Sequence, residues 1–316
     1  MEATTALVCD DIYKKHLTGP GHPEAPARCD AILNALQDAD FAARLLRLSP
    51  RAATDEEILA CHSRRYVATV KADIAAGRPN LSTGDTAICR DSLAAALHAA
   101  GGAMAAVDAV FDGRVANAFC AVRPPGHHAT ADAGMGFCIF NNAALAARYA
   151  QRRYGISRAL IVDWDLHHGN GTQDIFYEDG SVFYFSTHQW PMYPGTGLRG
   201  ETGMGRGLGT TLNCPVPAGA AGKEIVGAFR QQLLPAAGSF KPDLVVISAG
   251  FDARIGEPLG GLALTDEDFA ELTAICLQIA SEHAAGRVVS VLEGGYNLAG
   301  LASAVTEHCG ALAAGT

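Results

Sequence analysis

Aspartate and histidine side chains follow two apolar runs of the sequence, at the points where strands would end. The run ALIV leads into Asp163, Asp165 and His167, and the run LVVIS leads to Asp252. Alternate residues of an extended chain point to the same side, so the first three share one side. Burying carboxylates at the end of an apolar strand is costly unless a cation or hydrogen-bond donors compensate them. We therefore predict that Asp165, His167 and Asp252 hold a metal ion, and a structural salt bridge is the less favoured alternative.

The chemistry of this ligand set is that of a catalytic rather than a structural metal site. It has nitrogen and oxygen donors and no thiolate, and it leaves coordination positions for water and substrate, as a catalytic zinc site requires. The same donor types also accept Fe(II), Co(II) or Mn(II). The nine cysteines are scattered and never form a C-x-x-C pair, which argues against a cysteine-based zinc site and a disulfide framework.

Two further strand ends carry groups that could act on a substrate. His127 and His128 follow the run AFCAV and a rigid Arg-Pro-Pro-Gly turn, and adjacent imidazoles could serve as acid and base. The run RVVSVLE ends in a Gly-Gly turn that aims the phenol of Tyr296 toward the same edge, where it could bind an oxyanion. Each motif alone would more often be loop packing or a core aromatic, so their combination carries the prediction.

These side chains need a sheet whose strand ends meet. Short apolar or β-branched runs predict buried strands at residues 6–9, 118–122, 159–165, 182–186, 243–248 and 287–293. Helices are predicted between several of them, at residues 25–47, 92–112, 142–154, 222–237 and 266–284. This alternation predicts an α/β fold, with a mostly parallel, doubly wound central sheet and helices on both faces. Ligands of such sheets bind beyond the carboxyl ends of the strands.

Composition indicates a compact, soluble, globular chain. The 316 residues are 49% hydrophobic and 18% charged, without a linker-like stretch, so we expect one domain over residues 1–316. The net charge of −9 and the lack of a Lys/Arg cluster argue against nucleic-acid binding. The N-terminus lacks a basic start before an apolar run, and the Ala-rich stretch 92–111 is interrupted by His98 and Asp108. We therefore expect no membrane span and a cytoplasmic location.

An ordered set of motifs resembles the zinc-dependent histone deacetylases. These are RPPGHHA (123–129), VDWDLHHGNGTQ (162–173), PGTG (194–197), SAGFDA (248–253) and LEGGY (292–296), after an opening GHPEAPAR (21–28). The resemblance covers most of the chain, and an ordered set is far more specific than one motif. Asn170 and the opening motif favour the class II branch and the bacterial histone deacetylase-like amidohydrolases. The resemblance implies the arginase-deacetylase fold.

The resemblance also implies a role for each candidate residue. Asp165, His167 and Asp252 would hold one zinc ion per chain, and water activated by that ion would attack an N-acyl amide. His128 would take the proton of that water and return it to the leaving amine. The other implied roles are electrostatic stabilisation by His127, carbonyl polarisation by Tyr296, and orientation of His127 and His128 by Asp163 and Asn170. Beside neutral Asn170, protonated His128 should be less favoured than beside an aspartate.

Family comparison further implies a narrow tunnel for the acyl-bearing chain. Gly136, Phe137 and Tyr193 would line it, and Asp85 would hold the substrate backbone at its rim. Tyr193 departs from the usual phenylalanine, and its hydroxyl either polarises and narrows the tunnel or points to solvent. Leu259 stands where polyamine-selective relatives have a glutamate, which favours an acyl-lysine substrate.

The resemblance extends to two accessory features. A potassium ion is expected near backbone carbonyls of Asp163, Asp165 and His167 together with Ser186 and Thr187. Arg28 resembles an arginine beside an acetate exit route, although a buried structural ion pair is an equal alternative.

Other functions compete with the acyl-lysine deacylase. An amidohydrolase acting on acetylpolyamines or other small N-acyl amines is the main rival, and a binuclear manganese ureohydrolase is disfavoured because the ligands suit one ion. A non-catalytic acyl-group sensor is disfavoured by the complete catalytic set. Homo-oligomerisation is left open.

Overall fold

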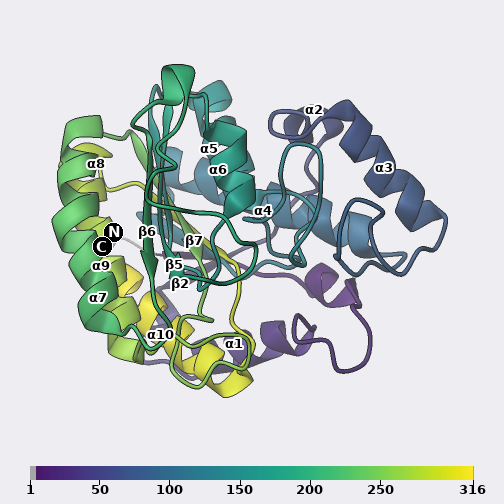
Figure 1. Ribbon diagram of the computed structural model, residues 1–316. Helices are drawn as coiled ribbons and strands as arrows, with labels where there is room; N and C mark the ends of the chain where they lie inside the picture. The colour runs from purple at the N-terminus through teal and green to yellow at the C-terminus, as the bar shows by residue number, and fades with distance from the viewer. Residues whose placement is uncertain (1–4, 316) are drawn as a thin grey trace.

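The centre of the protein is one parallel sheet. The structure, a computed structural model, describes residues 5–315, so the outermost residues of the predicted domain, 1–4 and 316, lie outside the described residues (Figure 1). Eight strands in the order β2-β1-β3-β8-β7-β4-β5-β6 pair in parallel throughout the sheet. They are β1 (Thr5–Val8), β2 (Leu45–Leu48), β3 (Asn117–Cys120), β4 (Ala159–Asp163), β5 (Val182–Gln189), β6 (Thr211–Val216), β7 (Leu244–Ala249) and β8 (Val288–Leu292). The predicted α/β class is confirmed.

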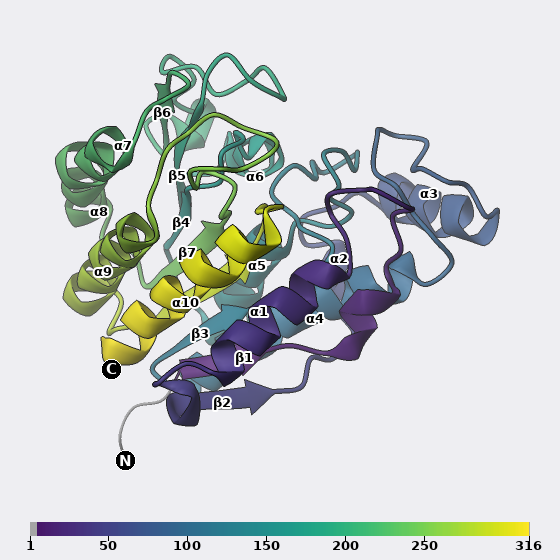
Figure 2. The ribbon, with the colours of Figure 1, turned by 90° about the horizontal axis from the view of Figure 1, so that it is seen from below.

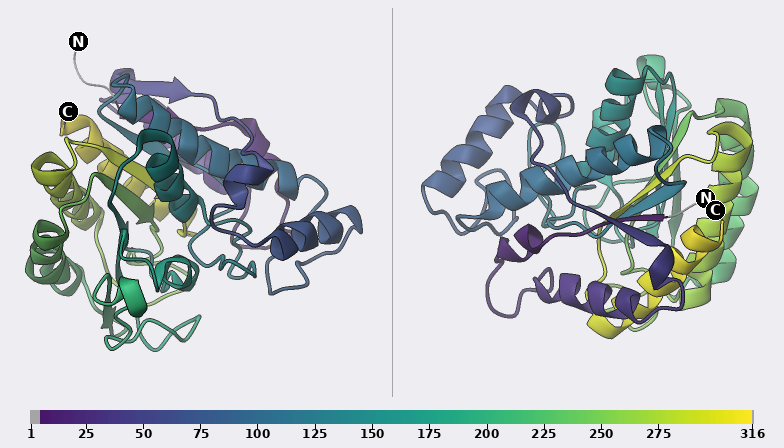
Figure 3. Two further views of the ribbon diagram at one scale, coloured as in Figure 1. Left: turned by 90° about the horizontal axis from the view of Figure 1, so that it is seen from above. Right: turned by 180° about the vertical axis from the view of Figure 1, so that it is seen from behind.

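Helices cover both faces of this sheet and bury two hydrophobic clusters against it. In Figure 3 the blue helices lie on one side and the green to yellow helices on the other. The first side contains α3 (Arg64–Ala75), α4 (Ser92–Phe111) and α5 (Asn142–Tyr154), with the short α2 (Asp55–Ile58) and α6 (Asn170–Phe176) nearby. The second side contains α1 (Ala27–Gln37), α7 (Gly222–Ala228), α8 (Leu234–Phe240), α9 (Asp266–His283) and α10 (Leu298–Ala314). In Figure 2 the purple α1 lies alongside the yellow α10.

Both strands at the edges of the sheet were absent from the sequence prediction. The predicted helix 25–47 is wrong beyond Gln37, because residues 45–48 form the edge strand β2, whose side chains are partly exposed. At the other edge, β6 contains Asn213 and Pro215, and proline is tolerated only where a strand lacks a neighbour on one side. Edge strands need no continuous apolar run, so the signal that identified the central strands is missing there.

Helix α4 is the apolar core helix on the α5 side of the sheet. Among the described residues it alone is long and apolar enough to cross a membrane by length and composition, and 67% of that apolar window is buried inside the protein. Gly101 lies where α4 passes the chain before α2, and a Cβ there would overlap the carbonyl oxygen of Arg51. A side chain at Gly101 would therefore push the two segments apart.

We expect Gly101→Ala to lower the free energy of unfolding by about 1–3 kcal/mol, because the added methyl overpacks this contact. The loss should appear although alanine is the better helix former by about 1 kcal/mol. Gly227→Ala in α7 is the matched control, since no neighbouring atom lies within 4 Å of the position that its Cβ would take, and it should not destabilise the protein. Urea unfolding followed by circular dichroism compares them, and equal effects would contradict the packing argument.

Candidate active site

The predicted metal ligands, the histidine pair and Tyr296 follow the carboxyl ends of four strands that are neighbours in the sheet. Strands β3, β8, β7 and β4 are consecutive, so the segments that leave them meet at one edge. His127 and His128 follow β3, and Tyr296 follows β8. Asp252 follows β7, while the Asp165 and His167 segment follows β4 directly. Parallel pairing thereby brings together residues that are far apart in sequence.

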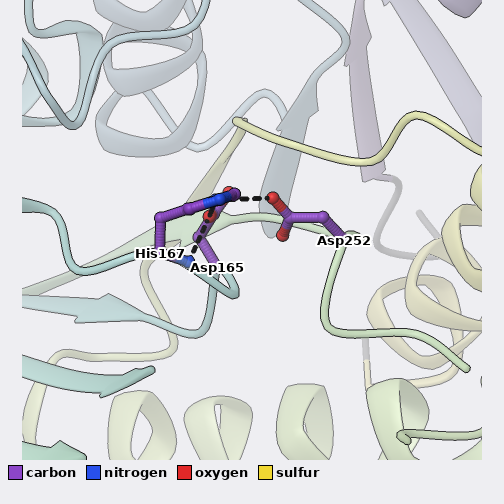
Figure 4. Close-up of side chains that lie close together, drawn as sticks. All are labelled: Asp165, His167 and Asp252. Atoms are coloured by element: carbon purple, nitrogen blue, oxygen red, sulfur yellow. Dashed lines mark hydrogen bonds and ion pairs between the residues drawn. The ribbon is translucent and has the colours of Figure 1, made fainter. Parts of the chain in front are cut away.

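Asp165, His167 and Asp252 form a compact, buried group that fits a metal ion. One potential ligand atom from each lies within 4.8 Å of the others. Nδ1 of His167 lies 3.2 Å from Oδ1 of Asp165 and 3.1 Å from Oδ2 of Asp252, with the three side chains converging in Figure 4. Two carboxylates and one imidazole match the donors of a catalytic zinc site and leave a coordination position open. The chain therefore supplies a suitable ligand set for a divalent cation.

The electrostatics of this group show why it needs a positive partner. Burial and the charge of Asp165 raise the pKa of Asp252. Burial opposes protonation of His167, but its hydrogen bonds to Asp165 and Asp252 raise its pKa to about 10. The backbone N–H groups of Leu166 and Gly294 donate to Asp252 and Asp165 over 2.9 and 2.8 Å. Hydrogen bonds therefore orient both carboxylates, and a positive charge between them compensates their repulsion.

The two adjacent histidines make different hydrogen bonds. Nδ1 of His127 lies 3.0 Å from Oδ2 of Asp163, whereas Nδ1 of His128 lies 2.8 Å from Oδ1 of Asn170. The two rings are buried, with centroids 4.1 Å apart. Because an amide oxygen only accepts, His128 donates through Nδ1, and in the neutral ring Nε2 is then unprotonated. The predicted pairs His127–Asp163 and His128–Asn170 are both present in the structure.

Their surroundings separate the protonation of these two imidazoles. Burial disfavours the charge of His127, but Asp165 and Asp163 outweigh it and hold the pKa of His127 well above its usual value. Burial lowers the pKa of His128 well below its usual value, and the charges of His127 and His167 lower it further. The pair therefore combines one imidazolium with one neutral imidazole, an arrangement suited to separate electrostatic and proton-transfer roles.

A cavity of about 120 Å³ opens above this group. All the residues predicted to contact substrate line this cavity, as do two of the candidate catalytic or metal-binding histidines and the candidate catalytic tyrosine. The full lining is Asp85, His128, Gly136, Phe137, His167, Tyr193, Leu259 and Tyr296. The rings of Phe137 and Tyr296 meet edge to face, with centroids 5.8 Å apart. A mostly apolar passage thus leads to a polar floor.

Tyr193 lines this cavity together with Asp85. Of the surface of this residue 37% is exposed, and burial followed by the charge of Asp85 raises the pKa of its phenol. The backbone N–H of Gly136 donates to Oδ1 of Asp85 over 2.7 Å and also interacts with Tyr193. Tyr193 therefore combines partial exposure with a nearby carboxylate, and the effect of its hydroxyl on the tunnel stays a prediction.

The accessory residues occupy two other positions around the site. Ser186 pairs with Asp163 across β4 and β5, and the buried Oγ1 of Thr187 has no hydrogen-bond partner within residues 5–315. Arg28 forms a buried ion pair with Glu24, so the structural alternative for this arginine is present. Its guanidinium also lies 5.0 Å from the ring centroid of Tyr296.

Two glutamates that hydrogen-bond to the backbone of the site were not identified from the sequence. Glu293 is buried and accepts hydrogen bonds from the backbone N–H groups of Gly126 and His127, which ties β8 to the histidine turn. Burial raises the pKa of Glu293 to about 7. An acid ending an apolar run could have identified it. Glu257 accepts from the N–H of Tyr296, and no local pattern marks it.

Comparison with known proteins agrees with the resemblance found in the sequence. The family model described as histone deacetylase domain matches residues 22–312. The chain is 39% identical to a probable deacetylase of Archaeoglobus fulgidus, covering 94% of this chain and 82% of the relative. It is 43% identical to polyamine deacetylase HDAC10 of Homo sapiens, covering 89% of this chain and 43% of the relative. The crystal structure of the HDA15 HD domain superposes with a TM-score of 0.91 at 38% identity, covering 98% and 90% of the two chains.

We expect Zn²⁺ to raise the Tm of chelator-treated protein, because an ion bound by the native state stabilises it by about 2.7 kcal/mol at one hundred times Kd. Asp252→Asn should abolish most of this rise, since a neutral amide replaces a charged ligand. Asp132→Asn removes an exposed carboxylate outside the site and is the control. Thermal unfolding with increasing zinc measures the shift, and equal shifts in both variants would exclude the assigned ligands.

Proposed function

The chain belongs to the histone deacetylase family of amidohydrolases, and on this premise we propose that it is a zinc-dependent deacylase of acyl-lysine side chains. The observation that carries the proposal is the convergence of His128, His167 and Tyr296 on one cavity beside two buried aspartates. A zinc ion held by Asp165, His167 and Asp252 would supply Lewis-acid chemistry, polarising the amide carbonyl and favouring ionisation of water.

The side chains around that position divide the remaining work. Nε2 of His128 accepts the proton of the attacking water and then delivers it to the nitrogen of the leaving amine. The phenol of Tyr296 donates a hydrogen bond to the carbonyl oxygen as negative charge develops on it. The imidazolium of His127, held by Asp163, stabilises the same charge through space. Asn170 keeps His128 in the tautomer whose Nε2 accepts a proton.

We expect wild-type protein to release a fluorophore from acetyl-lysine peptides, with inhibition by a chelator and by a hydroxamate. His128→Ala should lower kcat by about 10²–10⁴-fold, because it removes the general base. His283→Ala, at the end of α9, removes a histidine remote from the site and should leave kcat unchanged. A wild-type protein inactive on acyl amides would overturn the proposed function and favour an acyl-group sensor. A His128→Ala variant as active as the wild type would instead overturn the role of His128 as general base.

Acyl-lysine is favoured over acetylpolyamine by the distribution of acids around the cavity. Leu259 lines its wall, and the nearest acid of the same segment, Glu257, is turned toward backbone N–H groups instead. Asp85 is the carboxylate at the rim, where we propose that it accepts backbone N–H groups of a peptide. The distal ammonium of a polyamine would meet an apolar wall at Leu259. Polyamine hydrolysis is the second candidate because HDAC10 relatives are named polyamine deacetylases.

Leu259→Glu should raise kcat/KM for acetylputrescine by about tenfold or more and lower it for acetyl-lysine peptides, because it places a carboxylate against the distal ammonium. Leu259→Gln, of similar size but neutral, is the matched control and should give little gain. Steady-state kinetics on both substrates decide the point. Wild-type preference for acetylputrescine would instead establish the polyamine alternative.

We also retain two accessory proposals. Potassium near Ser186 and Thr187 is supported by the buried, unpartnered Oγ1 of Thr187 within the described chain. A role for Arg28 beside an acetate exit route is supported by its position under the Tyr296 ring, in addition to its ion pair with Glu24.

A further inference from the structure

Glu257 lies behind the candidate catalytic phenol and outside the cavity lining. It follows β7 in the loop before α9, and only 9% of its surface is exposed. Its carboxylate accepts the backbone N–H of Tyr296 at 3.2 Å for Oε1 and 3.1 Å for Oε2. The same Oε2 accepts the N–H of Asn297 at 3.2 Å. One side chain thus binds two successive N–H groups in a segment 39 and 40 residues away.

Hydrogen bonds hold the Tyr296 segment on both sides of the phenol, and Asn297 also caps the start of α10. Gly295 precedes Tyr296 with a φ of +117°, a conformation that residues with a Cβ rarely adopt, so glycine lets the chain turn here toward the site. Arg28 holds the opposite side by donating from Nε to the carbonyl oxygen of Gly295 over 2.7 Å. Asn297 joins the two loops a second time, donating from Nδ2 to the carbonyl oxygen of Gly256 over 3.0 Å. The Glu257 carboxylate accepts from the N–H groups on one side of Tyr296, and the Arg28 guanidinium donates to the preceding carbonyl on the other. Together these bonds fix the orientation of the peptide groups next to the phenol.

We propose that Glu257 is a positioning residue that orients Tyr296 toward the substrate carbonyl. The inference rests on the proposed function of Tyr296 and adds a residue that touches neither substrate nor metal ligands. An oxyanion donor is effective only when it is held in place before charge develops, so loosening its backbone lowers the rate of the chemical step. Leu259, on the same loop, forms the tunnel wall, and its contacts with substrate need not change when the carboxylate is removed.

A double-mutant cycle on the zinc-loaded full chain tests this role. Glu257→Ala should lower kcat for an acetyl-lysine peptide about tenfold with KM within about twofold, since the loss is confined to the transition state. On a Tyr296→Phe background the same substitution should cause almost no further loss, because the group that it positions is already absent. Glu257→Gln keeps an accepting oxygen and should retain most of the wild-type kcat.

The control and the thermal measurements separate positioning from general damage. Glu56→Gln removes an exposed glutamate of α2 and should change neither kcat nor KM. Equal losses from Glu257→Ala with and without the Tyr296 hydroxyl, or no loss in wild type, would overturn the proposal. If Glu257→Ala unfolds, the Glu257→Asp variant, whose shorter side chain moves the acceptor, enters the cycle. If the wild-type protein shows no turnover, the proposed function fails and the inference that rests on it fails too. If the wild type is active but the losses from Glu257→Ala and Tyr296→Phe simply add, only the positioning role fails.

Discussion

Burial of carboxylate charge at the ends of β4 and β7 constrains the whole site. Asp163, Asp165 and Asp252 have no exposed surface and lie beyond apolar strands. Such charges persist only when donors or cations compensate them. The imidazoles of His127 and His167 lie against these acids, and backbone N–H groups supply the remaining hydrogen bonds. The turns after β3 and β8 therefore lie where they bring an imidazole and a backbone N–H group to these carboxylates.

The same constraint makes two adjacent histidines unequal. His127 faces Asp163 and gains charge, whereas His128 faces a neutral amide and lies beside the charge that His127 carries. One imidazolium therefore helps to keep the other ring neutral and able to accept a proton. Glu293, which directly follows β8, accepts hydrogen bonds from the N–H groups of Gly126 and His127, so the histidine turn is anchored to the end of that strand. Because the two rings are buried and held in place, their pKa values stay apart, whereas water would screen the charges that separate them.

The central part of the fold was predictable from sequence, and its edges were not. Inner strands such as β4 and β7 are buried on both faces, so each is a continuous run of apolar residues. The edge strands β2 and β6 need no such run, and the helical spacing of residues 25–47 concealed the first of them. Glu257 was also not predictable. It accepts a hydrogen bond from the backbone N–H of Tyr296, and a backbone contact of this kind leaves no pattern in the sequence.

The sequence by itself determined which chemical groups stand at strand ends, the α/β class and the family resemblance, because apolar runs and turn residues are local features. Tertiary structure decided the partners. It placed Glu293 against the backbone N–H of His127 across 166 residues, and Glu257 against the backbone N–H of Tyr296 across 39 residues. These contacts depend on strand order, since β8 lies between β3 and β7 and so brings distant loops together. Local periodicity reflects burial and turning, whereas the neighbours of a strand are set by the packing of the entire sheet.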